Sequence, residues 1–537
     1  MKIWSRALCL TALCVSGCGD DEKSSNGNID ASIPTGLIDA GIDAGDAQLS
    51  AKKGPPPEVL RAAKEWPMAN RDYAGTRATL DSTITKATVA QLTQAWKFDL
   101  PAGGFFGAAT ASAVVVDGVI YYVDMTSNVY AIDKATGVAR WTKKYDANGG
   151  GPNGLAIGYG KVFVASSDKS FAALDLATGQ ELWSAPIELP KNAGFGIAPV
   201  VYGGLVYLSS VPVTSSTSYL GGVNGTLYAL DEATGKVVWS FLTVKDETLW
   251  GHPDINSGGG AWYPPTIDTD KDVMYWGIGN PAPYPGTPEF PNGSSHPGDN
   301  LYTNSVLAVG ALDGKYRWHY QERPHDIADL DFQNPPVLAT VNIAGEPRHL
   351  AIGSGKTGTV VAVDRDANGA RVWRTLVGKH ENDQLTAYPA DDAGVVVFPG
   401  DLGGVETPLA YADGTVFVPL LNMGRQFFAD KSGELDADGN GELIALDAAT
   451  GSVKWKKEIP KIVLGSATVV NDLVLTSSAY GVIYAFDRQT GEQVWMFQAP
   501  SGLNAPPTVV GDMLIVPLAG GIGGMLAPGG ILALKLP

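Results

Sequence analysis

One short motif recurs seven times along this chain of 537 residues. Each copy combines an alternating apolar stretch, a turn of the Asp-x-x-Thr-Gly type and a second stretch that carries Trp. The copies are Val129–Trp141, Phe171–Trp183, Leu227–Trp239, Leu307–Trp318, Val361–Trp373, Leu443–Trp455 and Ile483–Trp495. An Asp side chain can bind the turn backbone and Gly accepts a positive φ, so each copy predicts a tight β-hairpin. Recurring hairpins restrict the chain to a periodic all-β architecture.

The number of repeats and the two chain ends together predict a closed ring. Another pair of apolar stretches, such as VVVDGVIYYVD, precedes each hairpin, so one repeat corresponds to about four strands. Four-stranded repeats are typical of a β-propeller. Trp96 lacks the strand that normally precedes it, and the final stretch Ile531–Pro537 lacks a following Trp. The two ends are therefore predicted to complete one blade together, giving eight blades, with seven as the alternative.

The stretch Gly258–Asn334 combines residue types that bind ligands. It contains the segments GGGAWYPP, GIGNPAPY and RPHDIADLDFQN. Glycines let a planar ligand approach the backbone, and a Trp offers a stacking face. Asn and Asp oxygens are ligands of hard cations such as Ca²⁺. The stretch therefore predicts a ligand site that is held by the propeller.

The N-terminal residues predict export. A positively charged region, Met1–Arg6, precedes an apolar run that is too short to span a bilayer. Val15–Cys18 (VSGC) resembles the lipobox of bacterial lipoproteins. Residues 1–17 are therefore expected to be removed and Cys18 to be lipidated, with an ordinary secretory signal as the alternative. The protein is expected to be anchored to a bacterial membrane, on its periplasmic or outer-membrane face.

Residues 18–57 are small, polar and acidic, and they predict a flexible tether before a propeller in residues 58–537. The net charge of −18 argues against nucleic acid as a partner, because phosphate binding requires a basic surface. The sequence contains no CxxCH, P-loop, GxSxG or HExxH motif. Covalent haem and several common hydrolytic chemistries are therefore not expected.

The repeats, together with Trp66–Arg77 (WPMANRDYAGTR) and Ala499–Pro507 (APSGLNAPP), resemble the dehydrogenases that depend on pyrroloquinoline quinone (PQQ). The resemblance is to the alcohol dehydrogenases of this family and covers roughly Trp66 to Pro537. It implies an eight-bladed propeller that binds PQQ with Ca²⁺ or a lanthanide ion and oxidises an alcohol or polyol. Because a haem motif is absent, it implies an external electron acceptor, either a cytochrome c or a quinone.

The same resemblance assigns roles to five residues. Trp262, which follows a run of glycines, is similar to the Trp on which the quinone rests in this family. Asn280, in the segment GNP, is similar to a metal ligand. Asp329 is similar to the Asp that binds the metal and serves as general base, and Asp331 resembles the additional carboxylate of lanthanide-using members. Lys356, in the segment SGKTG, is similar to the basic residue that contacts the quinone.

Two family features have no counterpart in this sequence. The vicinal Cys pair of the family is absent, and Gly103–Gly104 or Phe105–Phe106 lies in the corresponding region. The metal-ligand Glu is also absent, because Val211–Gly225 contains no carboxylate. Two other hypotheses stay open. One is a non-catalytic scaffold like the outer-membrane assembly lipoproteins, which share the repeat, and the other is a metal-loaded binding module without quinone.

A second acidic segment, Asp436–Asp447 (DADGNGELIALD), resembles a calcium-binding loop of the EF-hand type. It has oxygen-bearing side chains at its first, third and fifth positions, Gly at the sixth and a carboxylate at the twelfth. However, Asp447 is also the turn Asp of its repeat, and the preceding residues are predicted to be strand. A polar hairpin without metal is therefore favoured over a structural calcium site.

Overall fold

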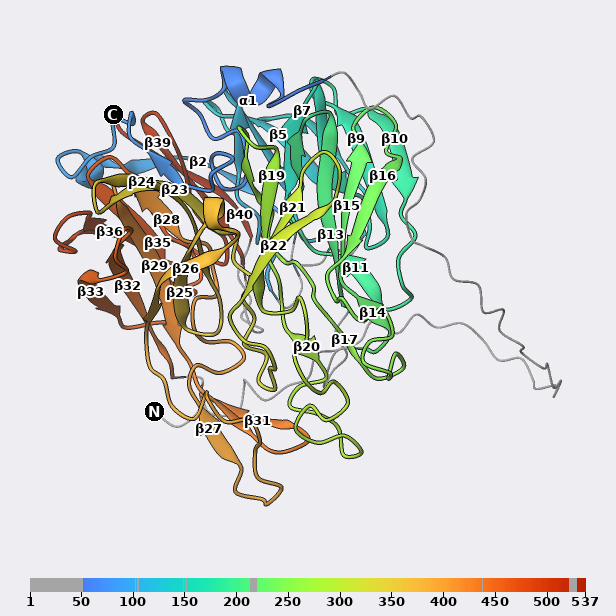
Figure 1. Cartoon of the computed structure of the whole chain (residues 1–537). Helices are drawn as coiled ribbons and strands as arrows, with labels where there is room; N and C mark the ends of the chain where they lie inside the picture. The colour runs from blue at the N-terminus through green and yellow to red at the C-terminus, as the bar shows by residue number, and fades with distance from the viewer. Residues whose placement is uncertain are drawn as a thin grey trace.

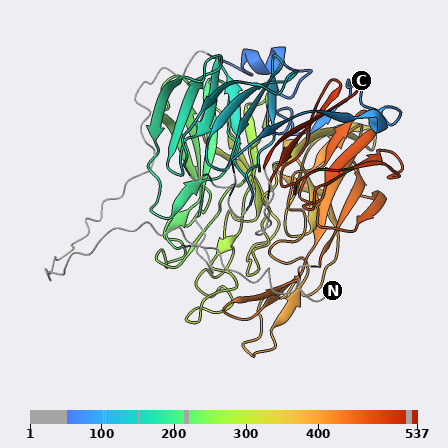
Figure 2. The same ribbon diagram turned by 180° about the vertical axis from the view of Figure 1, so that it is seen from behind.

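The computed structural model describes residues 52–101, 103, 106–147, 149, 152–212, 220–436, 438–520 and 529–537. The predicted signal peptide, Cys18 and most of the predicted tether lie outside these residues. A ring of twisted β-sheets forms the body of the protein (Figures 1 and 2). No helix within the described ranges is long and apolar enough to cross a membrane.

Eight antiparallel sheets form the ring, so the predicted all-β, eight-bladed propeller is confirmed. The first four blades contain β3 (Val114–Val116), β4 (Val119–Val123), β5 (Val129–Asp133) and β6 (Ala139–Lys143); β7 (Leu155–Gly158), β8 (Lys161–Ala165), β9 (Ser170–Asp175) and β10 (Glu181–Pro186); β12 (Val200–Tyr202), β13 (Leu205–Pro212), β15 (Thr226–Asp231) and β16 (Val237–Leu242), with β11 (Ala193–Phe195) beside β13; and β18 (Thr266–Asp268), β19 (Val273–Gly277), β21 (Ser305–Gly310) and β22 (Tyr316–Gln321).

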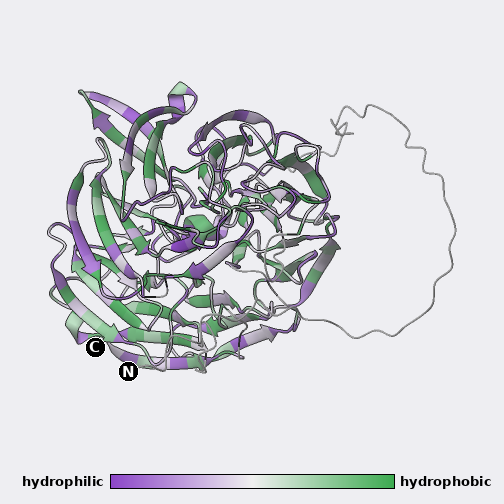
Figure 3. Ribbon diagram, turned by 90° about the horizontal axis from the view of Figure 1, so that it is seen from below, coloured by the Kyte–Doolittle hydropathy of each residue, from purple (hydrophilic) through white to green (hydrophobic). Residues whose placement is uncertain are grey.

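The remaining blades follow the same order along the chain. They contain β23 (Val337–Ile343), β24 (Glu346–Ser354), β25 (Thr359–Asp364) and β26 (Ala370–Leu376); β28 (Ala410–Ala412), β29 (Thr415–Asn422), β32 (Asn440–Asp447) and β33 (Val453–Ile459); β34 (Thr468–Val470), β35 (Leu473–Ser477), β36 (Val482–Asp487) and β37 (Gln493–Gln498); and β38 (Thr508–Val510), β39 (Met513–Leu518), β40 (Gly530–Lys535) and β2 (Thr93–Asp99). The ring arrangement is visible from below in Figure 3.

The two ends of the chain share the eighth blade, as the sequence predicted. Strand β2 pairs antiparallel with β40 from Thr93↔Lys535 to Asp99↔Gly530. The middle strands of the blades are buried on both faces, for example all five residues of β4, because each blade packs between two others. The outermost strands alternate between half-buried and exposed residues, as in β10. The hydrophobic core therefore lies between the blades.

In six of the eight blades, the repeated Trp connects its blade to the next one. Its indole Nε1 donates a hydrogen bond of 2.9–3.2 Å to a backbone carbonyl in the following hairpin. These pairs are Trp96 with Lys134, Trp141 with Leu176, Trp183 with Glu232, Trp239 with Ala311, Trp373 with Ala448 and Trp455 with Arg488. The ring face of the same Trp covers the Gly of that hairpin. The motif therefore encodes both the turn and the contact between blades.

Substituting Gly235 by Ala is expected to destabilise the propeller. Gly235 has a φ of +71°, and an added Cβ would lie 2.7 Å from the ring of Trp183. Gly118 is a matched control, because it has the same φ of +71° but no atom within 4 Å of an added Cβ. We expect Gly235→Ala to lower the free energy of unfolding by about 1–3 kcal/mol more than Gly118→Ala. Equal losses in denaturant unfolding would contradict a role for the Trp contact.

The segment that precedes the ring closes its axis. It begins with the short helix α1 (Pro57–Arg61) and ends with β1 (Ala78–Thr79), which pairs parallel with β34. The first strands of five blades each donate one backbone N–H to this segment at 2.7–2.9 Å. The pairs are Val115 with Trp66, Ile267 with Tyr73, Leu338 with Ala74, Tyr411 with Thr76 and Val469 with Arg77. The segment therefore joins non-adjacent blades across the centre of the ring.

Two small sheets lie outside the eight blades. One contains β14 (Val223–Asn224), β17 (Ser257–Gly258) and β20 (Pro281–Ala282), and the other contains β27 (Val395–Val397), β30 (Arg425–Phe427) and β31 (Ser432–Leu435). Both lie at the end of the ring opposite α1, at the bottom of Figure 1. The short 3-10 helices η1 (Val89–Gln91) and η2 (Arg365–Ala367) complete the described elements.

The EF-hand-like segment runs into a blade strand and ends at a hairpin turn. Residues Asn440–Asp447 belong to the blade strand β32. The Asp447 carboxylate accepts hydrogen bonds from the backbone of Ala449 and Thr450 and therefore serves as the turn residue of its repeat. A strand cannot curl around a single cation, so the twelve positions do not converge as an EF-hand loop requires.

Candidate functional site

All five predicted site residues come from loops at one end of the ring. Trp262 lies between blades three and four, and Asp329 and Asp331 lie between blades four and five. Asn280 and Lys356 lie in loops between the second and third strands of blades four and five. Because the strands alternate in direction, both kinds of loop leave the same end of the blades. This end is opposite to the Asp-x-x-Thr-Gly turns.

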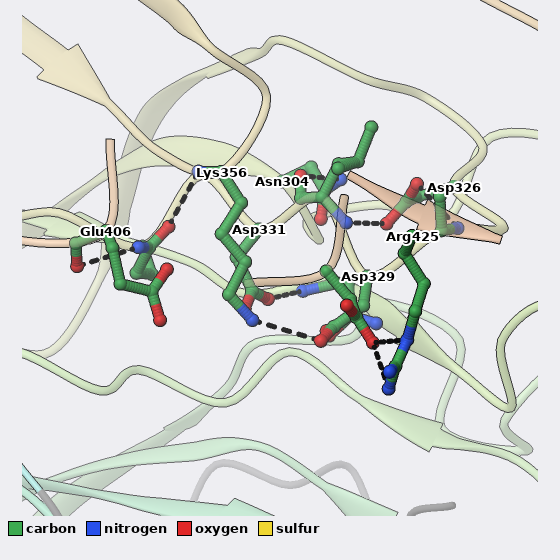
Figure 4. A network of polar contacts seen from close by, with 12 residues as sticks. Asn304, Asp326, Asp329, Asp331, Lys356, Glu406 and Arg425 are labelled. Atoms are coloured by element: carbon green, nitrogen blue, oxygen red, sulfur yellow. Dashed lines mark hydrogen bonds and ion pairs between the residues drawn. The ribbon is translucent and has the colours of Figure 1, made fainter. Parts of the chain in front are cut away.

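A buried ion cluster forms the centre of the site (Figure 4). The ammonium group of Lys356 lies 3.0 Å from Asp329 Oδ2 and 2.8 Å from Asp331 Oδ2. All three side chains are less than one-tenth exposed. Buried charges are stable only when they are paired, so one cation between two carboxylates leaves a negative excess. This excess favours binding of a further cation.

Asn280 and Trp262 adjoin this cluster. The backbone N–H of Asn280 donates to Asp331 Oδ1 at 2.6 Å, and its side-chain Nδ2 donates to Pro281 O at 2.9 Å. The neighbouring Gly279 lies so close that an added Cβ would be 2.7 Å from Asp331 Oδ1 and 3.0 Å from Trp262 Nε1. Trp262 is half-buried. The structure therefore places the aromatic ring, the amide and the carboxylate around one glycine.

Asp329 has an unusual backbone conformation and a buried carboxylate with a raised pKa. Its backbone φ is 57°, in the left-handed region that a non-glycine residue rarely adopts. Its oxygen Oδ1 is buried and has no hydrogen-bond partner among the described residues. Burial raises the pKa of Asp329 well above its usual value, against the opposing effect of Lys356, and Asp331 and Asp401 raise it further. A carboxylate with elevated proton affinity and an open oxygen is suited to accept a proton.

Three residues of the site were not predicted from the sequence. Glu406 lies in the connection between blades five and six, and its oxygen Oε2 is buried without a partner among the described residues. Asp401 lies in the same connection and pairs through Oδ2 with Arg425, with distances of 3.1 Å to both Nε and Nη2. These residues are more than 65 positions away from Asp329 along the chain. The glycines of the segment PGDLGG, which contains Asp401, favour close backbone packing but do not identify a buried carboxylate.

Replacing Glu406 by Gln is expected to remove part of the pH dependence of stability. Burial raises the pKa of Glu406 from 4.5 to about 7, with Lys356 opposing the shift. A raised pKa in the folded protein means that stability is fully present below pH 4.5 and is lost as the pH rises through 7. We expect Glu406→Gln to raise the Tm of the cofactor-free protein at pH 8 by about 3 °C, and to have little effect at pH 4.5. Parallel Tm curves across this pH range would contradict the prediction.

The site has the donor chemistry for a cation and a planar quinone. Buried oxygens without partners on Asp329 and Glu406 can accept further ligands. However, no three His, Cys, Asp or Glu side chains of the described ranges lie close enough together to hold a metal alone. Asn280 would have to contribute, and a Ca²⁺ ion would need additional oxygen ligands from a cofactor or water. The residues therefore fit a metal that binds together with a cofactor.

The structure describes only part of the two regions in which family features are missing from the sequence. Phe106, in the region of the missing Cys pair, is about half exposed at 52%, whereas Phe105 lies outside the described residues. Residues 213–219 of the loop Val211–Gly225, which lacks the family Glu, also lie outside them.

Comparison with known proteins places the chain among the quinoproteins. A family model described as "Glucose/ethanol/alcohol dehydrogenase, beta-propeller domain" matches residues 190–383. A second model, described as "Outer membrane protein assembly factor BamB", matches residues 81–240 and 356–531. The first model covers most of the candidate site, whereas the second covers mainly the repeats on either side of it.

Individual proteins support the same placement. The chain is 31% identical over 420 residues to a quinohemoprotein alcohol dehydrogenase of Comamonas testosteroni, covering 70% of this chain and 57% of that protein. The crystal structure of the quinohemoprotein alcohol dehydrogenase from this organism superimposes with a TM-score of 0.75 at 25% identity, over 89% of this chain and 82% of that one. A europium-containing methanol dehydrogenase shares the fold, with a TM-score of 0.75 at 21% identity over 89% and 100% of the two chains. The chain thus belongs to the family of PQQ-type β-propellers that contains the quinoprotein alcohol dehydrogenases.

Proposed function

We propose that the protein is a PQQ- and metal-dependent oxidoreductase that oxidises an alcohol or polyol and passes the electrons to an external acceptor. The observation that carries this proposal is the buried cluster of Asp329, Asp331 and Lys356 beside Asn280 and Trp262. This cluster lies in a chain whose relatives include alcohol dehydrogenases. Acidic, amide and aromatic groups at one end of a propeller fit a metal and a flat cofactor together.

When bound, PQQ supplies the acceptor for the two electrons that an alcohol loses as it becomes a carbonyl compound. Asp329 takes the hydroxyl proton at Oδ1, the oxygen that has no other partner in the described protein. Lys356 donates to Asp329 Oδ2 and so keeps Oδ1 turned away from the ammonium group. Trp262 provides a stacking face that shields the reacting groups from water.

The proposed metal is Ca²⁺ or a lanthanide ion, held by Asn280, Asp329 and Asp331. The negative excess of the cluster supports a highly charged cation, since each added carboxylate strengthens the attraction. The ion would act as a Lewis acid on the cofactor, which is one established use of bound metals. Electrons would leave to a cytochrome c or a quinone, because the chain has no haem-attachment motif.

The proposal predicts cofactor-dependent activity of the purified chain. The experiment mixes the protein with PQQ and either Ca²⁺ or La³⁺, measures thermal shift, and follows dye reduction with a panel of alcohols. We expect a higher Tm with PQQ and metal together than with either alone. If neither a thermal shift nor dye reduction is seen with Ca²⁺ or with La³⁺, the proposal is contradicted. That result would favour the non-catalytic scaffold with which the protein shares its repeats.

We also propose that the protein is exported and held on a bacterial membrane through a lipid on Cys18. The support is the sequence of the N-terminus alone. Expression of the full chain with a radiolabelled fatty acid should label the wild-type protein and leave Cys18→Ser unlabelled. Labelling of both proteins, or of neither, would contradict the lipid anchor.

A further inference from the structure

The ion pair of Asp401 and Arg425 has no role in the function proposed so far. Asp401 is 5% exposed, and only its Oδ2 oxygen contacts the guanidinium of Arg425. The Oδ1 oxygen is buried and accepts no hydrogen bond from the described residues. A buried carboxylate oxygen without a donor is unfavourable, so the structure leaves a position for a hydrogen-bond donor from a ligand.

The local fold holds this pair rigidly. Arg425 begins β30 and pairs with Val397 of β27, in the small sheet outside the blades. Gly400, next to Asp401, donates its N–H to Met423 O at 2.8 Å. Gly424 packs against the ring of Phe398, where an added Cβ would lie 2.5 Å from a ring carbon. The connection between blades five and six and a loop of blade six are therefore fixed side by side, which restricts the movement of the Asp401 side chain.

The pair lies next to the reacting carboxylate. Figure 4 shows the guanidinium of Arg425 beside Asp329. The negative charge of Asp401 acts on Asp329, raising its pKa in addition to the effect of burial and of Asp331. Arg425 keeps 23% of its side chain exposed, so the pair reaches the solvent on its Arg425 side. A ligand whose reacting group meets Asp329 therefore has the Asp401 carboxylate among its charged neighbours.

We propose that Asp401 determines substrate specificity by accepting a hydrogen bond from a second hydroxyl group of the substrate. The inference rests on the proposed function, in which Asp329 takes the proton of the first hydroxyl. Two buried carboxylate oxygens without donors, in one site, match two hydroxyl groups of one substrate. The preferred substrate class is therefore a diol or larger polyol, with vicinal diols as its simplest members, rather than a monohydric alcohol. Arg425 is a positioning residue, because it occupies Oδ2 and leaves Oδ1 as the acceptor.

The test compares propane-1,2-diol with propan-1-ol as substrates of the holoenzyme. We expect the wild type to prefer the diol in kcat/KM by about 30-fold, since a site built around a buried acceptor rejects a ligand that lacks the donor. Replacing the pair together, as Asp401→Leu with Arg425→Leu, avoids leaving an unpaired buried charge. We expect this double variant to lose about nine-tenths or more of the preference, chiefly through a fall in kcat/KM for the diol.

Three further measurements separate this inference from its alternatives. The matched control is Asp268→Leu with Arg365→Leu, which removes a similarly shielded ion pair at the turn end of the blades; its diol preference should equal that of the wild type. PQQ and metal affinities, measured by fluorescence titration, should be unchanged in the Asp401/Arg425 variant. A tenfold loss of either affinity would overturn the inference by making Asp401 a cofactor or metal ligand.

Equal activity of the wild type on both alcohols would overturn the inference while leaving the proposed function intact. A wild type that binds no PQQ would instead contradict the proposed function itself.

Discussion

Replacing Asp329 by Asn is expected to lower kcat for alcohol oxidation by about 1,000-fold, the range in which removal of a general base falls. Asn has the same size as Asp but cannot accept a proton at physiological pH. The substitution keeps a polar side chain beside Lys356, whose ammonium lies 3.0 Å from Asp329 Oδ2. Initial rates with saturating alcohol, PQQ and metal measure the effect. A kcat within tenfold of wild type would show that another group takes the proton.

The same variant also needs a control for cofactor binding. If Asp329 binds the metal as well, Asp329→Asn should weaken metal affinity, which a titration followed by thermal shift measures separately from turnover. Asp268→Asn is the matched substitution, because this Asp is also shielded and forms an ion pair, in its case with Arg365. It lies at the opposite end of the blades and should leave kcat and metal affinity unchanged in the folded protein. A fall of kcat in both variants would indicate a general loss of structure.

Replacing Arg77 by Met is expected to lower the free energy of unfolding by about 4 kcal/mol or more, among the largest effects of any single substitution here. Arg77 is fully buried in the segment that closes the axis of the ring. Its guanidinium donates to five acceptors at 2.9–3.4 Å, which are Ala467 O, Ala69 O, Asn70 Oδ1, Thr468 Oγ1 and Pro507 O. Met has nearly the same length and no donor, so these buried acceptors would lose their partners.

Denaturant unfolding of the purified protein tests this expectation. Arg140→Met is the control, because Arg140 is half exposed and pairs with the turn residue Asp133 at the rim. It should change the free energy of unfolding by less than about 1 kcal/mol. If Arg77→Met does not accumulate as a folded protein, Arg77→Lys provides the measurement, with a smaller loss expected because the ammonium can still donate. Equal stability of Arg77→Met and Arg140→Met would contradict the importance of the axial segment.

The fold could be predicted from the sequence because its determinants are local and repeated. Each hairpin carries its own turn Asp, its Gly and its Trp within about 13 residues, for example Val129–Trp141. The unmatched Trp96 and the unmatched C-terminal strand then predicted the closure of the ring, which the pairing of β2 with β40 confirms. Seven blades, the alternative, would have left these two ends without partners.

The site could be predicted only in part. Asn280, Asp329, Asp331 and Lys356 are clustered in the structure, as the family resemblance implied, although their roles stay predictions. The resemblance assigned roles only to residues in motifs that are typical of the family. It assigned no role to Asp401, Glu406 or Arg425. These side chains reach the site through connections whose course depends on packing between blades. Their neighbours in the sequence are ordinary loop residues, so no local pattern separates a buried carboxylate from a solvated one.

The shared eighth blade has a consequence for how the protein is made. Strand β2 is synthesised more than 430 residues before its partner β40. The ring therefore stays open while the chain is being elongated, and its first and last blades meet only when synthesis has passed Lys535. Closure is a late step with a high loop-closure cost, so folding should be slow and should follow release of the chain. A chain that stays unclosed until then is also a chain that can be threaded through a translocation channel.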